Sequence, residues 1–370
     1  MSLTEQIRHK ARALGFTSVG FAPADPLKGA EFYARWVALG YAGQMDYLKR
    51  HLDKREDPRR MVPGAQTAIC LGMDYYQPTP TAPDPLRGQI ACYARGDDYH
   101  DIIKKRLAAL WEFVLAEAGE QTKGRYFVDT APVLERELAQ RAGLGWWGKN
   151  TCLIDKRRGS YFFLAEIITD LKLDYDEPAP DHCGTCTRCL DACPTDAFPE
   201  PYVLDAQRCI SYLNIELKGS IPRDLRQGMG QWIFGCDICQ EVCPWNRKTE
   251  PALEPAYKSR VGLDSPALLD LIQLDRAAFN ALFRRNPVKR PKRRGFLRNV
   301  AVALGNSGMQ AAVPALISAL DDEEPLVRGH VAWALGQLGG DEAKGALQRR
   351  LGIEDDAEVL GELKDALAAL

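Results

Sequence analysis

Residues 183–194 read Cys-Gly-Thr-Cys-Thr-Arg-Cys-Leu-Asp-Ala-Cys-Pro, and residues 236–244 read Cys-Asp-Ile-Cys-Gln-Glu-Val-Cys-Pro. With Cys209 between them, these stretches hold all but three of the chain's 11 cysteines. The remaining three, Cys70, Cys92 and Cys152, are scattered. Because a reducing cytosol keeps thiols unpaired, clustered cysteines in such a compartment indicate bound metal rather than disulfides.

The two cysteine runs predict a pair of iron–sulfur cubes. The spacing Cys-x2-Cys-x2-Cys-x3-Cys-Pro is that of bacterial ferredoxins, in which three thiolates bind one [4Fe–4S] cube and the fourth binds a second cube. This logic assigns Cys183, Cys186, Cys189 and Cys243 to one cube and Cys193, Cys209, Cys236 and Cys239 to the other. Four-cysteine zinc sites are the alternative, but both Cys-Pro ends fit cubes better. We therefore expect a ferredoxin-like α+β module over residues 176–250 that conducts single electrons.

The composition is that of an ordinary globular protein. A length of 370 residues suggests two or three domains, and 46% apolar with 26% charged residues excludes disordered or fibrous classes. No run of about 18 apolar residues is present, so we expect no membrane span and no membrane partner. The first residues read as an amphipathic helix rather than an export signal, which predicts a cytoplasmic protein.

Residues 1–175 alternate helical and strand-like patterns, which favours an α/β domain. Helices are expected at residues 4–14, 99–118 and 133–142. Strands are expected at residues 67–76, 89–94, 126–128 and 161–168. The Pro-Ala-Pro stretch at 178–180 reads as a linker into the cysteine-rich block.

Residues 251–370 are predicted to be helical and contain an internal repeat. Residues 300–305 (Val-Ala-Val-Ala-Leu-Gly) match residues 331–336 (Val-Ala-Trp-Ala-Leu-Gly). Leu316 and Leu320 recur at the same offset as Leu347 and Leu351, and Ala366-Leu367 is a weaker third copy. Paired helices that repeat every ~30–45 residues are typical of HEAT-like solenoids. The alternative is two helices that are similar by coincidence.

A basic stretch lies where these repeats begin. Between residues 284 and 298 there is no acidic side chain, and the basic ones are Arg284, Arg285, Lys289, Arg290, Lys292, Arg293, Arg294 and Arg298. In a chain of net charge −2 this is a local asymmetry that can follow a phosphate backbone. A solvated linker is the alternative. We expect RNA recognition by shape and phosphate through Lys289, Arg290, Lys292, Arg293 and Arg294, because no base-reading module is evident.

The common redox cofactor motifs are absent from the sequence. No Gly-x-Gly-x-x-Gly supports a nicotinamide site, and no Cys-x-x-Cys-His supports a c-type haem. The five histidines are dispersed, and each is expected to be a surface or packing residue. Residues 98–101 begin like the Asp-x-His-x-x-Gly cobalamin motif, but Ile103 stands in place of the glycine. The residues alone therefore leave the electron acceptor open.

Several stretches together resemble the epoxyqueuosine reductase family, and the resemblance covers essentially the whole chain. They are residues 55–58, 126–130, 143–150, 159–161, Tyr212 near Cys209, and the two cysteine runs as far as Asn246. The resemblance implies a cytosolic relative of the reductive dehalogenases that holds base-off cobalamin, not ligated by histidine, beside two [4Fe–4S] clusters. It implies the last step of queuosine synthesis, on the anticodon stem-loop of tRNA carrying epoxyqueuosine, with electrons from an unidentified low-potential donor.

The family's reaction converts an epoxide into an alkene, which requires two electrons and two protons and releases water. The resemblance implies that residues 1–175 form the cobalamin-binding catalytic domain and that residues 251–370 bind tRNA. Two other functions remain open on the residues alone. One is a dehalogenase-like enzyme acting on a small molecule, and the other is a non-catalytic electron carrier joined to an interaction scaffold.

The resemblance also implies roles for individual residues. Asp129 lies where the family's proton donor falls, so it is expected to be the general acid. Its alternative role is to cap a helix that opens near Ala131-Pro132. Family position implies that Asp129 also contacts the cobalamin, together with Arg55, Cys92, Leu153, Ser160 and Asp237.

Some of these positions have simpler interpretations. Cys92 can equally be a small buried hydrophobe on a strand. Trp146 and Trp147 are expected to fill core, with packing on the corrin as the alternative. Lys149 is expected to meet either a polar group of the cofactor or solvent.

Overall fold

A computed structural model describes residues 1–78 and 84–370. The chain forms two compact units, each assembled from stretches that are separate in sequence. The first unit comprises Met1–Gln77, Asp98–Gln207 and Ile238–Lys258. The second comprises Pro78–Asp97, Arg208–Asp237 and Ser259–Leu370. The division into domains at 1–175, 176–250 and 251–370 stays a prediction.

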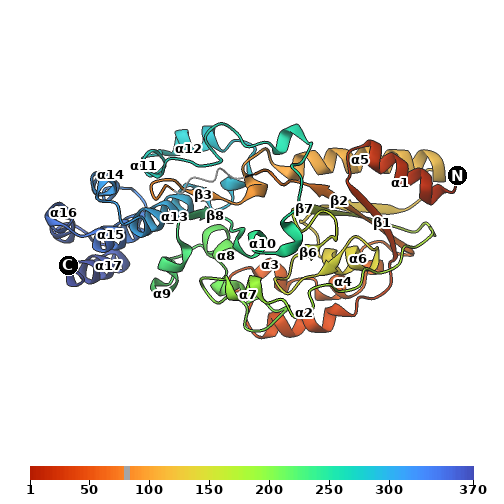
Figure 1. The fold of residues 1–370 in the computed structure, drawn as a ribbon, viewed down its shortest axis with the longest axis horizontal. Coiled ribbons are helices and arrows are strands. Elements are labelled where there is room, and N and C mark those ends of the chain that lie inside the picture. Colours follow the sequence, from red (N-terminus) through yellow and green to blue (C-terminus); the bar gives the residue numbers. More distant parts are fainter. Residues whose placement is uncertain (79–83) are drawn as a thin grey trace. The chain divides into compact units, whose positions relative to one another are not determined.

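The first unit is built on one four-stranded sheet (Figure 1). Its strands, in the spatial order β1-β2-β7-β4, are Ser18–Pro23, Thr67–Asp74, Phe162–Thr169 and Gly124–Phe127. All three pairings are antiparallel. The expected mixture of helices and strands is therefore present, but the intervening helices do not form parallel crossovers. Alternation along the sequence sets which elements occur, not the direction in which the strands run.

Helices lie against the sheet of the first unit. Helices α1 (Leu3–Ala13) and α5 (Tyr99–Ala118) contact each other, and between them contact strands β1, β4 and β7. Helix α6 (Glu135–Arg141) packs on β1, β2 and β7, where its Leu138 joins an apolar cluster with Cys70 and Ile168. Since neighbouring residues of a strand point to opposite faces, Ile69 and Leu71 face away from α6. The sheet is thus buried on both sides.

The rest of the first unit consists of short elements. These are α2 (Gly29–Ala38), α3 (Asp46–Lys49), α4 (Leu52–Glu56), the hairpin of β5 (Trp146–Trp147) with β6 (Leu153–Ile154), α7 (Arg188–Asp191) and α10 (Ile238–Glu241). Helices α7 and α10, which carry predicted cluster ligands, contact each other.

The second unit is mostly helical. Strand β3 (Gln89–Ile90) pairs in parallel with β8 (Trp232–Phe234). The helices are α8 (Ile210–Ile215), α9 (Arg223–Arg226), α11 (Leu268–Leu271), α12 (Arg276–Leu282), α13 (Lys292–Asn306), α14 (Val313–Ala319), α15 (Pro325–Leu338), α16 (Asp341–Leu351) and α17 (Ala357–Ala368). The strand expected at residues 89–94 is shorter, because Cys92–Ala94 forms a 3₁₀ turn.

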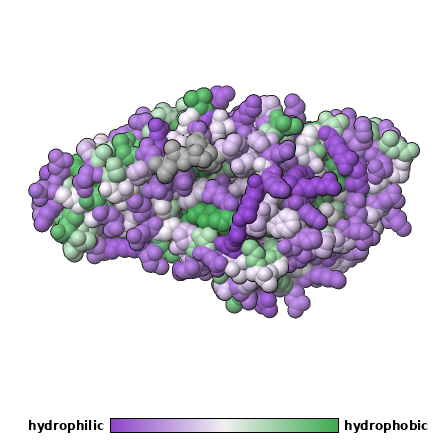
Figure 2. Space-filling view, in the orientation of Figure 1, coloured by the Kyte–Doolittle hydropathy of each residue, from purple (hydrophilic) through white to green (hydrophobic). Residues whose placement is uncertain are grey.

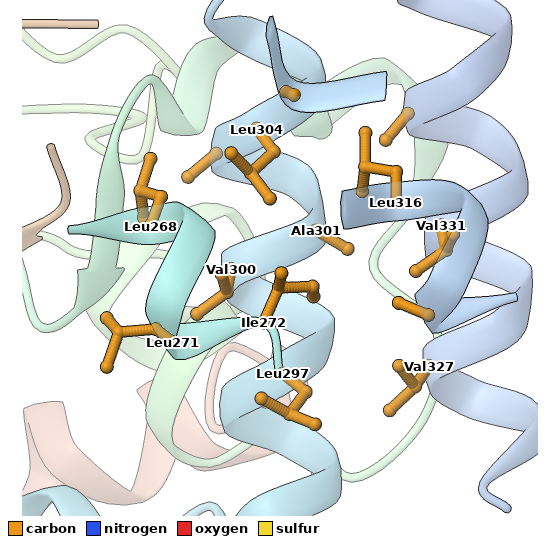
Figure 3. Packing of buried hydrophobic residues seen from close by; sticks show 14 of the residues in the cluster. Leu268, Leu271, Ile272, Leu297, Val300, Ala301, Leu304, Leu316, Val327 and Val331 are labelled. Carbon is orange, nitrogen blue, oxygen red and sulfur yellow. The ribbon is translucent and has the colours of Figure 1, made fainter. Parts of the chain in front are cut away.

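The internal repeat has a packing explanation. Helix α13 packs on α15, and α15 packs on α17. A methyl group added at Gly305 would lie 2.7 Å from the Trp333 ring, and one at Gly336 would lie 2.8 Å from the Cβ of Ala366. The repeated glycine therefore lets the next helix approach closely. Leu304, Leu316 and Val331 fill the space between these helices (Figure 3).

Among the described residues, no helix has the length and apolar character needed to cross a lipid bilayer. Large apolar side chains at the surface include Leu253, Val261 and Ile353. The face drawn in Figure 2 is dominated by hydrophilic side chains.

Candidate active site and metal centre

Asp129 follows β4 in a strained backbone conformation. Its φ of 53° lies in the left-handed region, which costs a non-glycine residue ~1–2 kcal/mol. Its backbone N–H donates to Oε1 of Glu135 at 2.8 Å. Helix α6 begins at Glu135 after Leu134, with no side-chain cap. The alternative role of Asp129 as a helix cap is therefore wrong.

The Asp129 carboxylate faces the beginning of α5. Its Oδ2 accepts a hydrogen bond from the hydroxyl of Tyr99 at 2.5 Å and lies 3.8 Å from Nε2 of His100. Nδ1 of His100 lies 2.8 Å from Oδ1 of Asp98. The Asp129 side chain is 61% exposed, so a ligand can reach it. This arrangement of carboxyl, phenol and imidazole can hold a proton and transfer it.

In the sequence, residues 98–101 begin like a cobalamin motif, and no pattern there connects them with Asp129. Burial would raise the pKa of the Asp98 carboxyl, but hydrogen bonds from His100 outweigh it and lower that pKa. Asp98 therefore carries a negative charge that orients the imidazole. Only the packing of α5 beside β4 brings these residues together, and no spacing rule relates positions so far apart.

Four predicted cluster ligands surround one cavity in the first unit. Cys183, Cys186, Cys189 and Cys243 line it, with about 340 Å³ of empty space. Burial, followed by the neighbouring charges of Cys243 and Cys183, raises the pKa of Cys189 to about 11. Thiolates that repel each other in this way need cations between them, and four sulfur donors suit an iron–sulfur cube. The residues therefore fit the predicted group.

Lys149 holds the cysteine loop in place. Its ammonium group donates to the carbonyl oxygens of Gly184 at 2.7 Å and Cys186 at 3.0 Å, and the residue is 9% exposed. The expectation that Lys149 meets solvent is therefore wrong, and its contact with a polar group of the cofactor stays a prediction. Asn150 similarly donates to the carbonyl oxygen of Cys239 at 3.2 Å.

Trp146 is a core residue beside this cavity, as expected. It is 1% exposed and meets Trp245 edge-on at 5.0 Å between ring centroids. Both belong to an apolar cluster with Cys183 and Cys243. Trp147 instead stacks under the guanidinium of Arg136 at 4.6 Å.

The other four predicted ligands are divided between the units. Cys193 and Cys239 belong to the first unit, and Cys209 and Cys236 belong to the second. Cys193 accepts a hydrogen bond from the backbone N–H of Ala197 at 3.4 Å. The assignment of these four thiols to a second cube stays a prediction.

Besides Asp129, three expected cobalamin contacts lie in the first unit. Arg55 is 7% exposed, and its buried Nε has no hydrogen-bond partner among the described residues. Leu153 packs in the apolar cluster beneath α6. The hydroxyl of Ser160 accepts from the amides of Gln240 and Asn246 at 3.0 and 2.9 Å, so Ser160 ties the second cysteine run to the sheet.

The other two expected contacts, Cys92 and Asp237, lie together in the second unit. The backbone N–H of Cys92 donates to Oδ2 of Asp237 at 2.6 Å, and both residues are 3% exposed. Cys92 starts a 3₁₀ turn, so its interpretation as a residue within a strand is wrong. Asp237 is held against the backbone of this turn.

The basic stretch does not form one continuous surface. Lys289, Lys292 and Arg294 are exposed and line an open hollow with Arg276 and Arg293, with about 1050 Å³ of empty space. Arg293 is partly buried in an ion pair with Asp322 at 2.5 Å, and Arg290 pairs with Glu216 at 2.5 Å.

Arg298, the last cation of this stretch, is fully buried. Its guanidinium donates to the carbonyl oxygens of Leu213, Leu217 and Gly219, which anchors α13 to α8 and the residues after it. Burial lowers the pKa of Arg298 to about 9. The reading of Arg298 as part of a basic surface is therefore wrong.

Three family models match separate parts of the chain. A 4Fe-4S double cluster binding domain matches residues 182–246, which confirms the prediction of two clusters over zinc. HEAT repeats match residues 294–368, which confirms the predicted repeats. A model described as epoxyqueuosine reductase QueG matches residues 55–130.

Curated relatives match over most of the chain. The epoxyqueuosine reductase of Xanthomonas campestris is 45% identical over 90% of this chain and 96% of its own length. The chain belongs to the epoxyqueuosine reductase family. The epoxyqueuosine reductase of Escherichia coli is 38% identical over 90% of this chain and 89% of its own. The chain is accordingly an oxidoreductase, and the predicted resemblance is confirmed.

Solved structures of epoxyqueuosine reductases superpose on the whole chain. One is 31% identical, covers 100% of this chain and 99% of its own, and has a TM-score of 0.94. A second, with a TM-score of 0.93 and 31% identity over 100% of this chain and 98% of its own, was solved with an epoxyqueuosine-modified tRNA-Tyr stem loop. A third, from Bacillus subtilis, is 30% identical over 100% of this chain and 99% of its own with a TM-score of 0.92, and has its catalytic aspartate loop swung out of the active site.

Proposed function

We propose that this chain reduces the epoxide of epoxyqueuosine in tRNA to the alkene of queuosine, the last step of that modification. The observation that carries the proposal is the Asp129 carboxyl, exposed at one side and hydrogen-bonded to Tyr99 at the other, in a chain of this family. The tRNA stem loop bound to a relative supports the anticodon stem-loop as substrate.

The reaction sets two requirements for the protein. Two electrons and two protons are consumed, and the epoxide oxygen leaves as water. An alkoxide leaves poorly unless an acid protonates it within hydrogen-bond reach. Asp129 is the proposed acid, Tyr99 fixes the direction of its carboxyl through the hydroxyl, and His100 is oriented beside it by Asp98. The aspartate of the loop named in the Bacillus subtilis relative supports this assignment.

Cobalamin is the proposed acceptor of the electrons. When bound in its base-off form it would supply a reduced, strongly nucleophilic cobalt, with the two cubes as the source of its electrons. Within residues 1–78 and 84–370, the buried Nε of Arg55 and the buried indole N–H of Trp147 have no hydrogen-bond partner. Such donors suit the carboxamides at the edge of a corrinoid. We propose that Cys92, Asp129, Leu153, Ser160 and Asp237 contact it as well.

The surroundings of the reaction follow from its chemistry. Two low-potential clusters need a low-potential electron donor, which we propose as a separate partner. Queuosine is made in tRNA, so we propose that the protein works in the cytoplasm.

The function is tested with the protein reconstituted with iron, sulfide and cobalamin in the absence of oxygen. We expect conversion of epoxyqueuosine in tRNA to queuosine, measured as the loss of one oxygen atom from the nucleoside by mass spectrometry. Conversion should require both cobalamin and a reductant. Epoxyqueuosine that stays unconverted in the presence of bound cobalamin and reduced clusters would contradict the proposed function.

The tRNA is proposed to bind the hollow at the start of α13. Exchanging Lys292 and Arg294 for glutamate is expected to weaken binding of an epoxyqueuosine stem-loop. The slope of log affinity against log salt should fall by ~1–2, since each lost phosphate contact removes a little under one unit. Arg293 is left in place, because its removal would leave the partly buried Asp322 without its cation.

The matched control exchanges Lys344 and Arg349, two exposed cations of α16, for glutamate. Both double variants change the net charge equally, so long-range repulsion is the same in each. Equal binding by the two variants, measured by fluorescence anisotropy across a salt series, would exclude the hollow as the tRNA site.

A further inference from the structure

A buried carboxyl lies in the apolar layer beneath the Asp129 loop. Glu166 on β7 is 0% exposed and pairs across the sheet with Cys70 on β2 and Phe127 on β4. Its strand neighbours Phe162 and Ile168 belong to the cluster packed against α6, and by strand alternation Glu166 points the same way. A carboxylate in such a layer is costly unless it is neutralised or paired.

Glu166 has no conventional partner. Among the described residues neither of its carboxyl oxygens meets a conventional donor, and its side chain shares a hydrogen bond with the carboxyl of Glu135. Burial, followed by the charge of Glu135, raises its pKa well above the usual range. Glu135 begins α6, directly above this layer. Two neighbouring carboxyl groups satisfy one another only when at least one of them is protonated.

Glu135 connects this buried group to the proposed acid. Its Oε1 accepts the backbone N–H of Asp129 at 2.8 Å. Burial, followed by the charge of Asp129, raises the pKa of Glu135 to about 8. The hydrogen bonds with the backbone of Asp129 and with Glu166, and then the charge of Arg136, act in the opposite direction and are outweighed. Cys70, the thiol on β2, is fully buried.

We propose that Glu135 is a positioning residue, kept protonated over the buried Glu166, that holds Asp129 in its strained conformation toward Tyr99. The inference rests on the proposed function. A neutral Glu135 accepts the N–H of Asp129 without repelling its carboxylate. An ionised Glu135 places a second negative charge beside that carboxylate and favours departure of the loop.

The direction of the pH dependence follows from the raised pKa. The protonated form of Glu135 is present at neutral pH and is lost as the pH rises through about 8. Turnover should therefore decline on the alkaline side, in the range where Glu135 ionises. The charged groups around Glu135 are Asp129 and Glu166 on neighbouring elements and Arg136 on its own helix. All three are present in the wild type and in the variants proposed below.

The test compares Glu135→Gln and Glu135→Ala in the reconstituted holoenzyme, with kcat and KM for epoxyqueuosine tRNA measured between pH 6 and pH 10 (about two units on either side of the shifted value). The glutamine oxygen still accepts the N–H of Asp129 but cannot ionise. We expect kcat within ~3-fold of wild type at neutral pH, with the alkaline decline abolished or moved to higher pH. The alanine variant removes the acceptor and should lose ~10-fold or more in kcat with KM little changed.

Glu137→Gln is the matched control. Glu137 lies on the same helix, where it accepts from the backbone of Lys28 and Gly29, and its replacement should leave the pH profile unaltered. The inference would be overturned if kcat of Glu135→Gln declined at alkaline pH as in the wild type. It would also be overturned if a folded Glu135→Ala kept the full kcat. Should the alanine variant fail to fold, the glutamine variant still decides.

A second measurement is independent of turnover. Infrared difference spectra of the holoenzyme should show the carbonyl band of a protonated carboxylic acid that disappears between pH 7 and pH 9 (about one unit around the shifted value) and is absent from Glu135→Gln. No such band would overturn the inference even in an active enzyme. Failure of the proposed function would give a different result. The wild-type enzyme would then show this band but would not convert epoxyqueuosine.

Discussion

Replacement of Asp129 by asparagine is expected to lower the single-turnover rate on epoxyqueuosine tRNA by ~10²–10⁴-fold, the usual contribution of a general acid. Asparagine keeps the size of the side chain and an oxygen that accepts from the Tyr99 hydroxyl. It has no acidic proton for the departing epoxide oxygen. The rate is measured anaerobically with chemically reduced protein, so that electron supply does not limit it.

Asp25→Asn is the control for this variant, since Asp25 is another exposed aspartate of the first unit outside the proposed site. It should react at the wild-type rate. Cobalamin and stem-loop affinities should stay within ~3-fold of wild type for Asp129→Asn, because the lost interaction acts in the transition state. A fully active Asp129→Asn would remove the assignment of the acid.

Replacement of Cys243 by alanine is expected to abolish turnover by removing one cube. Iron content should fall from about eight to about four atoms per chain, since each [4Fe–4S] cube carries four. Cys243 lines the cavity with Cys183, Cys186 and Cys189, and three thiolates with an open corner hold a cube poorly. Iron analysis and electron paramagnetic resonance of the reduced protein measure the loss.

Cys152→Ala is the matched control, because Cys152 is outside both predicted ligand sets and should leave iron content and activity intact. Full iron content with an unchanged spectrum in Cys243→Ala would exclude Cys243 as a ligand. Retention of the spectrum with loss of turnover would instead assign Cys243 a role apart from metal binding.

Much of the fold could be predicted from local pattern. Helix α5 spans the predicted residues 99–118 because its apolar positions recur at helical spacing and Asp98 caps its first turn. The HEAT repeats were visible because Gly305 and Gly336 occupy equivalent positions where helices approach closely. The cysteine runs were visible because a cube dictates ligand spacing. In each case the physical constraint leaves a regular spacing of residue types in the sequence.

The features that could not be predicted depend on contacts between residues that only the folded chain brings together. Arg298 and Lys149 look like surface cations in the sequence, yet both donate to backbone carbonyls in the interior. Glu166 reads as a polar position in a strand, and its burial follows from the layer packed over it. The link between Asp129 and Tyr99 joins two elements whose order in the sequence says nothing about their distance.

The separation of Cys243 from the other three ligands of its cavity has a consequence for biosynthesis. The ribosome releases residues 183–189 long before Cys243 emerges, and the intervening chain must reach its final path before the fourth thiol arrives. Closing so long a loop is entropically unfavourable. We therefore expect iron–sulfur assembly at the four predicted ligands to follow the folding of the chain between residues 189 and 243.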